Sequence, residues 1–109
     1  MSTALKVLGQ VVPLATTLTT LYTVPALTST VVSSIVVSNN SGTATSFRIA
    51  VRPAGAAIDP KHYLYYDVTL AGNDTFVATV GVTLATTDVV SVYSTLATLA
   101  FSAFGQENT

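Results

Sequence analysis

The side chains that could carry chemistry are few in this chain of 109 residues. His62 is the only histidine, and Asp59, Lys61 and Asp67 lie near it in the sequence. A metal site needs several ligands that converge from different strands, and acid–base catalysis needs an imidazole partnered within a cleft. One histidine among isolated carboxylates offers neither pattern. We therefore expect His62 to be a hydrogen-bonded structural residue at the rim of the core rather than a pH sensor or a ligand.

Serine and threonine are abundant, but a hydroxyl nucleophile needs a base to activate it. No Gly-x-Ser-x-Gly motif accompanies the lone histidine. The four aspartates stand singly at loop or strand ends, where carboxylates commonly accept hydrogen bonds from turn amides. This spacing favours neither a hydrolase with paired carboxylates nor a calcium loop. We expect no enzymatic activity, no cofactor, no metal and no small-molecule substrate.

Two arginines and two tyrosines are the least ordinary pairs. Arg48 and Arg52 are expected on the outward face of one strand, where they keep that face soluble, pair with acidic residues across a subunit boundary, or bind phosphate. Tyr63 and Tyr65 alternate along another strand and, together with the neighbouring Tyr66, offer a platform on which a sugar could stack. Alternating aromatic residues more commonly pack within a sheet or an interface, and we favour packing over glycan binding.

The composition points to association with other protein chains. Charged residues make up 8% of the sequence, against roughly 25% in ordinary soluble domains, while hydrophobic residues reach 50%. So few charges leave much of the surface to Thr, Ser and Ala or to contacts with other subunits, so we expect a homo-oligomer or a component of an assembly. A net charge of −1 argues against nucleic-acid binding, which normally requires a basic face.

The chain contains no apolar stretch of about 18 residues, so neither a membrane-spanning helix nor a membrane partner is expected. Its first twelve residues lack the continuous apolar region of a secretory signal, and we expect synthesis in the cytoplasm.

Short β-branched runs separated by turn residues recur about every ten residues. They predict a single all-β domain, an antiparallel β-sandwich or small barrel of immunoglobulin-like or jelly-roll type with seven or eight short strands. Within it we expect an N-terminal strand or arm over 1–17, a sandwich domain over 18–105 and a polar, frayed tail over 106–109. The expected strands are 3–12, 18–24, 30–38, 44–51, 62–70, 75–84, 89–93 and 96–104.

Residues 18–53 are expected to form a three-strand unit. The turn residues Asn39 to Gly42 predict that 30–38 and 44–51 pair antiparallel. Alternation places Val32 and Val36 on one side of the middle strand, which a second sheet or another subunit would have to cover. In 62–70, the same alternation turns Leu64 and Tyr66 inward and Tyr63 and Tyr65 outward.

Five segments resemble small virion proteins of tailed bacteriophages, including cyanophages: LYTVPA at 21–26, VVSSIVVSN at 31–39, FRIAVRP at 47–53, KHY at 61–63 and DVVSVY at 88–93. The similarity covers about residues 18–105, and its motifs mark strand starts and turns. Related modules serve as capsid decoration or cement proteins, or as β-sandwich units of tail and fibre proteins.

The resemblance therefore implies a non-enzymatic virion structural protein. We favour a capsid decoration or cement protein, made in the host cytoplasm and placed on the capsid exterior, where a homotrimer would bind across subunits of the major capsid protein. The alternative is a tail or fibre module that binds host surface glycans. The candidate interface residues are Leu5, Val7, Val12, Val32, Val36, Arg48, Arg52, Tyr63 and Tyr65.

Overall fold

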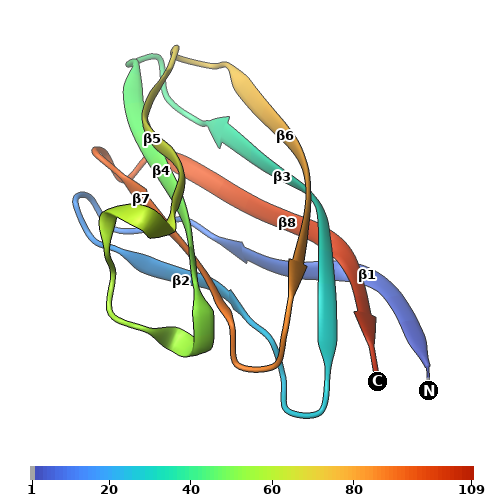
Figure 1. Cartoon of the computed structure of the whole chain (residues 1–109). Helices are drawn as coiled ribbons and strands as arrows, with labels where there is room; N and C mark the ends of the chain where they lie inside the picture. The colour runs from blue at the N-terminus through green and yellow to red at the C-terminus, as the bar shows by residue number, and fades with distance from the viewer. Residues whose placement is uncertain (1) are drawn as a thin grey trace.

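The computed structural model describes residues 2–109, which form two four-stranded antiparallel sheets packed face to face (Figure 1). Sheet A has the order β1-β8-β3-β6 and sheet B the order β2-β7-β4-β5. The expected all-β sandwich is confirmed. No helix within residues 2–109 is long and apolar enough to cross a membrane. The strands are β1 Thr3–Val11, β2 Thr19–Thr23, β3 Ser29–Asn39, β4 Thr45–Arg52, β5 Tyr63–Leu70, β6 Thr75–Leu84, β7 Val89–Ser94 and β8 Leu99–Asn108.

The order of the strands is that of a jelly roll. Each strand of the first half pairs with the strand at the same position counted back from the end of the chain: β1 with β8, β2 with β7, β3 with β6, and β4 with β5. The pairs β3–β8 and β4–β7 join these ladders into the two sheets. A long hairpin folded over on itself produces this wrapping, which decides between the two sandwich topologies left open by the sequence.

The core lies between the sheets and is built from alternate residues of both. Phe47 at its centre contacts Phe76 and Phe101, with ring centroids 5.3 and 6.1 Å apart, and such tilted and edge-on geometries are favourable for aromatic rings. The other large side chains that are fully buried are mostly aliphatic and come from both sheets: Ile35, Ile49, Leu84, Leu99, Val24, Val32, Val37, Val90 and Val92.

The segment 39–44 does not make the expected hairpin. Strands β3 and β4 belong to different sheets, so the predicted three-strand unit over 18–53 is wrong. Asn39 is buried, and its side-chain amide donates to the Thr43 carbonyl at 2.8 Å and the Ala71 carbonyl at 3.2 Å. Its Oδ1 accepts the Ser41 N–H at 3.1 Å. These bonds stabilise a crossing between the sheets, which the turn residues alone do not distinguish from a hairpin.

A β-bulge at Ser33 corrects the predicted faces of β3. The register slips between Val32 and Ser34 against both neighbouring strands. A bulge inserts one residue and reverses the alternation beyond it. Val32 therefore shares the inner face with Ile35 and is fully buried, while Val36 lies on the outer face. The second sheet covers Val32, so this residue is not available to another subunit.

The first and last strands, β1 and β8, lie side by side in sheet A (Figure 1). Thr3 pairs with Asn108, and the backbones of Ser2 and Thr109 exchange hydrogen bonds of 2.9 and 2.8 Å. Residues 1–17 thus include a regular strand rather than an arm, and the expected frayed tail over 106–109 is wrong because 106–108 complete β8. The polar side chains of this segment suggested fraying, but pairing with two neighbouring strands orders it.

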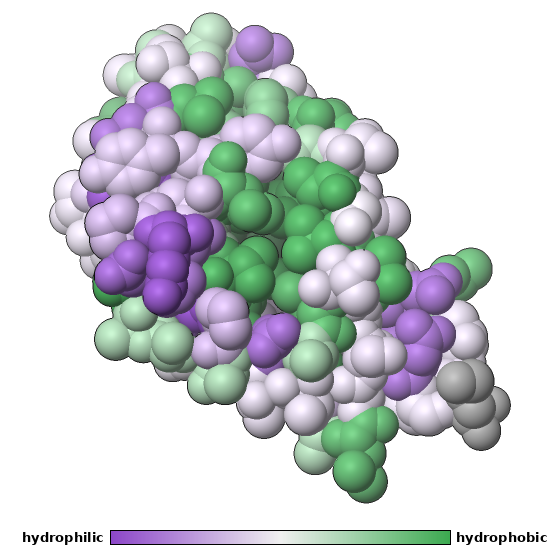
Figure 2. All heavy atoms as spheres, viewed as in Figure 1, coloured by the Kyte–Doolittle hydropathy of each residue, from purple (hydrophilic) through white to green (hydrophobic). Residues whose placement is uncertain are grey.

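The two sides of the sandwich differ. On one side β1 approaches β2 so closely that a Cβ at Gly9 would overlap the Leu21 carbonyl oxygen. On the other side, the edge strands β5 and β6 leave inward residues only partly buried, among them Tyr65, Val68, Phe76, Val80 and Val82. Figure 2 shows hydrophobic residues gathered between β6 and the connection from β4 to β5. This side leaves the core less well covered by the chain.

Candidate binding surfaces

Arg48 is the centre of an aromatic cluster on the outer face of sheet B. Its guanidinium carbon lies 4.2 Å from the ring centroid of Tyr66, 4.4 Å from that of Tyr93 and 5.9 Å from that of Tyr63. The guanidinium also donates to both carboxylate oxygens of Asp67, at 2.6 Å from Nε and 3.3 Å from Nη2. The bond to Asp67 raises the pKa of Arg48 above its ordinary value. This side chain is held in place from several directions.

A bulge in β5 supplies two members of this cluster. Phe47 pairs with Val68 and Ile49 with Tyr65, so Arg48 faces both Tyr66 and Asp67 on β5. Asp67 has a φ of 52°, a left-handed conformation that is uncommon outside glycine and least so for Asp and Asn. The predicted alternation of β5 is therefore wrong at Leu64, Tyr65 and Tyr66, although Tyr63 and Asp67 lie on the outer face as predicted. Tyr65 packs inward against Phe76, with centroids 5.4 Å apart, and Tyr66 points to solvent.

A hollow of about 510 Å³ opens beside this cluster. The tyrosine rings of residues 63 and 66 meet at 81° with centroids 4.9 Å apart and form two of its walls. The remaining lining residues belong to the connection between β4 and β5: Ile58, Asp59 and Pro60. Aromatic walls beside one carboxylate are suited to binding a small ligand with both apolar and hydroxyl groups.

Arg52 holds the connection 53–62 against sheet B through hydrogen bonds within the chain. Its Nε donates to Ser91 Oγ at 3.1 Å, and its Nη1 donates to the carbonyls of Gly55 and Ala56 at 3.3 and 2.9 Å. Arg48 likewise pairs with Asp67 of the same chain. Both arginines thus have partners within the chain, and pairing with acidic residues across a subunit boundary, one of the three alternatives for this pair, stays a prediction.

His62 is structural, as expected. It is buried, and its side-chain Nδ1 accepts the backbone N–H of Asp59 at 3.1 Å, while the backbone N–H of His62 donates to the Asp59 carbonyl at 2.9 Å. The Asp59 side chain in turn accepts the Lys61 N–H at 3.1 Å. These reciprocal bonds close the short 3-10 turn Pro60–His62 that enters β5. Within residues 2–109, no three His, Asp or Glu side chains gather as a metal site would require.

The outer face of sheet A is the second candidate surface, and the register defines it. Its side chains form cross-strand rows over β1, β8, β3 and β6: Leu5, Gln106, Val31 and Thr83; Val7, Phe104, Ser34 and Thr79; Gln10, Ser102, Val36 and Val77; and Ala100, Ser38 and Thr75. None of these side chains is charged. Leu5 is 81% exposed and Val77 58%. We call these rows the A face.

The structure thus divides the predicted interface residues among several places. Leu5, Val7 and Val36 come together on the A face, while Val12 is exposed just beyond the end of β1. The other predicted residues lie elsewhere, namely Val32 and Tyr65 against the core, Arg48 and Tyr63 in the aromatic cluster, and Arg52 under the connection 53–62.

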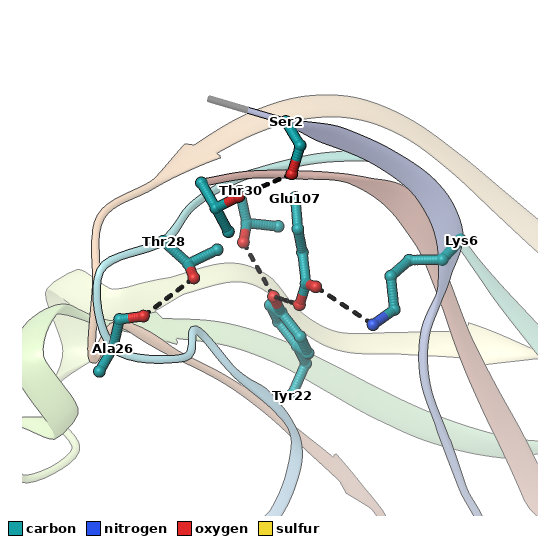
Figure 3. A network of polar contacts seen from close by, with 8 residues as sticks. Ser2, Lys6, Tyr22, Ala26, Thr28, Thr30 and Glu107 are labelled. Atoms are coloured by element: carbon teal, nitrogen blue, oxygen red, sulfur yellow. Dashed lines mark hydrogen bonds and ion pairs between the residues drawn. The ribbon is translucent and has the colours of Figure 1, made fainter.

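At one end of sheet A, Tyr22 joins the sheets through a polar network (Figure 3). Its hydroxyl donates to Glu107 Oε2 at 2.5 Å and lies 2.8 Å from Thr30 Oγ1. Glu107 Oε1 pairs with Lys6 Nζ at 3.1 Å. Burial and the bond to Glu107 raise the pKa of Tyr22 to about 12, and the bond from Tyr22 holds the pKa of Glu107 below its usual range.

Sequence reasoning missed Asp67 and Tyr93 as neighbours of Arg48, and it placed Tyr66 on the inward face although it named that residue in the possible sugar platform. Two signals were present. The doublet Tyr65-Tyr66 breaks a strict alternation of faces, and Asp67 offers a charge opposite to that of Arg48 on a separate strand. Neither signal reveals a bulge, because the register of β5 depends on how the whole strand pairs.

Comparison with known proteins adds no relative: no family model, no curated protein and no solved structure matches this chain.

Proposed function

We propose that this chain is a non-enzymatic structural protein of a phage virion, a decoration or cement protein that docks on the assembled capsid through the A face. The observation that carries the proposal is the absence of charge from that face. Leu5, Val7 and Val77 are all exposed on it, and a soluble surface normally interrupts such rows with Lys, Glu or Asp. Faces of this kind are suited to burial against another protein.

The architecture supports the same proposal by analogy. Jelly rolls are common in viral capsid proteins, although the fold also occurs in lectins and enzymes. The resemblance of the strand and turn motifs to phage virion proteins points in the same direction. Copies of this chain, three in our proposal, would lie on the capsid exterior, each contacting the major capsid protein.

Stabilisation would follow from mass action. A protein that binds the assembled shell but not its separated subunits shifts the equilibrium towards the shell. A broad, uncharged and preformed sheet is well suited to this task, because its backbone is already ordered before it binds. The mechanism needs no covalent chemistry.

The test is where the protein sits in the virion and what its loss does. Immunogold labelling should mark the head rather than the tail, and the copy number should be comparable to that of the major capsid protein. Particles assembled without the protein should release DNA at lower temperature and at low salt. Labelling confined to the tail, or unchanged stability of particles that lack the protein, would contradict the proposal.

A further inference from the structure

The hollow beside the aromatic cluster lies on sheet B, away from the A face, and has the features of a built ligand site. Its volume of about 510 Å³ falls within the roughly 300–1,000 Å³ usual for small-molecule sites. The connection 53–62 supplies one wall, and Arg52 holds that connection in place through two backbone carbonyls.

The aromatic walls are preorganised. Tyr66 is packed against the guanidinium of Arg48 and against the ring of Tyr63. Arg48 is in turn fixed by Asp67 and by Tyr93 on its other side. Tyrosine has few rotatable bonds, and these contacts restrict them further. A ligand that stacks here would therefore lose little affinity to the ordering of side chains.

The distribution of charge narrows the class of ligand. Asp59 is the only charged residue among those that line the hollow, so an anionic ligand is disfavoured. A cationic ligand would meet the positive guanidinium that already lies over Tyr66. A neutral ligand is repelled by neither charge, and one with apolar C–H faces and several hydroxyls can contact both the aromatic rings and the carboxylate. Of the two carboxylate oxygens of Asp59, Oδ1 accepts a hydrogen bond from within the described residues. Oδ2 can therefore accept one from a ligand hydroxyl.

We propose that this hollow binds a neutral pyranose sugar, stacked on the ring of Tyr63 or Tyr66, with a hydroxyl donating to Asp59. The inference is independent of the virion role. It keeps Tyr63 and Tyr66 of the sugar platform considered for the tyrosines of β5 and leaves out Tyr65, which packs against Phe76 instead.

The test is a two-dimensional NMR titration of the isotopically labelled full chain with maltohexaose, cellohexaose, mannohexaose and laminarihexaose. At least one should shift the amide signals around Asp59 and Tyr66 saturably, with a dissociation constant in the millimolar range or tighter. Methyl monosaccharides form a parallel arm: equal binding would assign the site to free sugars, and binding of hexasaccharides alone would assign it to a polymer. Sialyllactose is the charged comparison. No response from any neutral sugar, or a response to sialyllactose alone, would overturn the proposal.

Variants locate the site. Tyr66→Ala should weaken binding at least about tenfold, because the stacking surface is lost, whereas Tyr66→Phe keeps the ring and should bind within a few fold. Leu64→Ala is the matched control, since Leu64 is exposed on the same strand but does not line the hollow. Unchanged chemical shifts away from the substitution show that each variant is folded. Equal affinity of Tyr66→Ala and Leu64→Ala would place the sugar elsewhere and contradict the assignment.

Discussion

Tyr22 shows how one hydroxyl can join the two sheets. It belongs to β2 of sheet B, whereas Thr30 and Glu107 belong to β3 and β8 of sheet A. The hydroxyl is buried and fully engaged, because it donates to Glu107 and can accept from Thr30. A buried polar group that loses its partner is more costly than the net gain from the bond. The network therefore makes the relative position of the sheets depend on Tyr22.

Tyr22→Phe should lower the free energy of unfolding by about 1–3 kcal/mol at neutral pH, because both partners lose a bond. The pH dependence should change as well. In the folded protein the pKa of Tyr22 is raised from 10.0 to about 12, so the stabilisation is full below pH 10 and is lost between pH 10 and 12. Urea unfolding of both proteins across this range should show the difference between them shrinking as the pH rises.

The stability of the protein at acid pH gives an independent check of the same network. The folded-state pKa of Glu107 is lowered, and its first cause is the bond from Tyr22, so stability is lost as the pH falls below the usual value of 4.5. Tyr22→Phe should reduce this acid loss. Tyr66→Phe, which removes an exposed hydroxyl, is the control and should follow the wild-type protein at both extremes. An identical pH profile for Tyr22→Phe and the wild-type protein would contradict the role of the network.

Among the elements, the contact between β3 and β8 depends on a glycine. A Cβ at Gly105 would overlap the carbonyl oxygen of Val31, in the middle of sheet A. Gly105→Ala should therefore lower the free energy of unfolding by about 2–3 kcal/mol, as overpacking typically does. Urea unfolding measures the loss directly.

Gly42→Ala is the matched control. It is the same substitution in the crossing between β3 and β4, where the new Cβ would lie 3.9 Å from its nearest neighbour, Asn73 Nδ2. Its effect should stay within about 0.5 kcal/mol. If the two variants unfold at the same urea concentration, the close approach of β8 to β3 is not as described.

The strand positions could be predicted from the sequence, but strand pairing could not. Runs of β-branched residues between turn residues are local signals, and every expected strand overlaps an observed one. Pairing is non-local: Asn39 to Gly42 has the composition of a hairpin, yet its bonds to Ala71 stabilise a crossing between sheets. The bulge at Ser33 separates Val32 from Val36, which the alternation had placed on one side, and the bulge at Tyr66–Asp67 turns Tyr65, predicted outside, towards the core.

The same limit explains how much of each candidate surface was predictable. Leu5, Val7 and Val36 were predicted as interface residues because they are hydrophobic and lie on expected strands. The structure gathers them on the A face because side chains alternate regularly between the two faces of the sheet in the parts of β1 and β3 where they lie. The aromatic cluster was found only in part. Tyr63 and Arg48 were identified, but their neighbour Tyr66 comes to the surface only because of the bulge in β5.

At the scale of the whole molecule, the scarcity of charged side chains is concentrated on one surface, the A face. The described ion pairs join Lys6 to Glu107 at the end of sheet A and Arg48 to Asp67 on sheet B. The A face between β1 and β6 has none. Apolar residues that are exposed together on one rigid sheet favour association, and the absence of like charges removes the repulsion that keeps soluble monomers apart.

We therefore expect the purified 11.2 kDa chain, in which no capsid covers the A face, to self-associate through that face at micromolar concentration. Val7→Glu and Val77→Glu place a charge at opposite edges of the A face, on exposed positions where folding tolerates it, and each should shift the protein to monomer in sedimentation velocity. Burying an uncompensated carboxylate in an apolar contact is strongly unfavourable. Thr69→Glu, on the exposed edge strand of sheet B, is the control and should leave the oligomer intact. A monomeric wild-type protein, or dissociation by Thr69→Glu alone, would show that the A face does not mediate self-association.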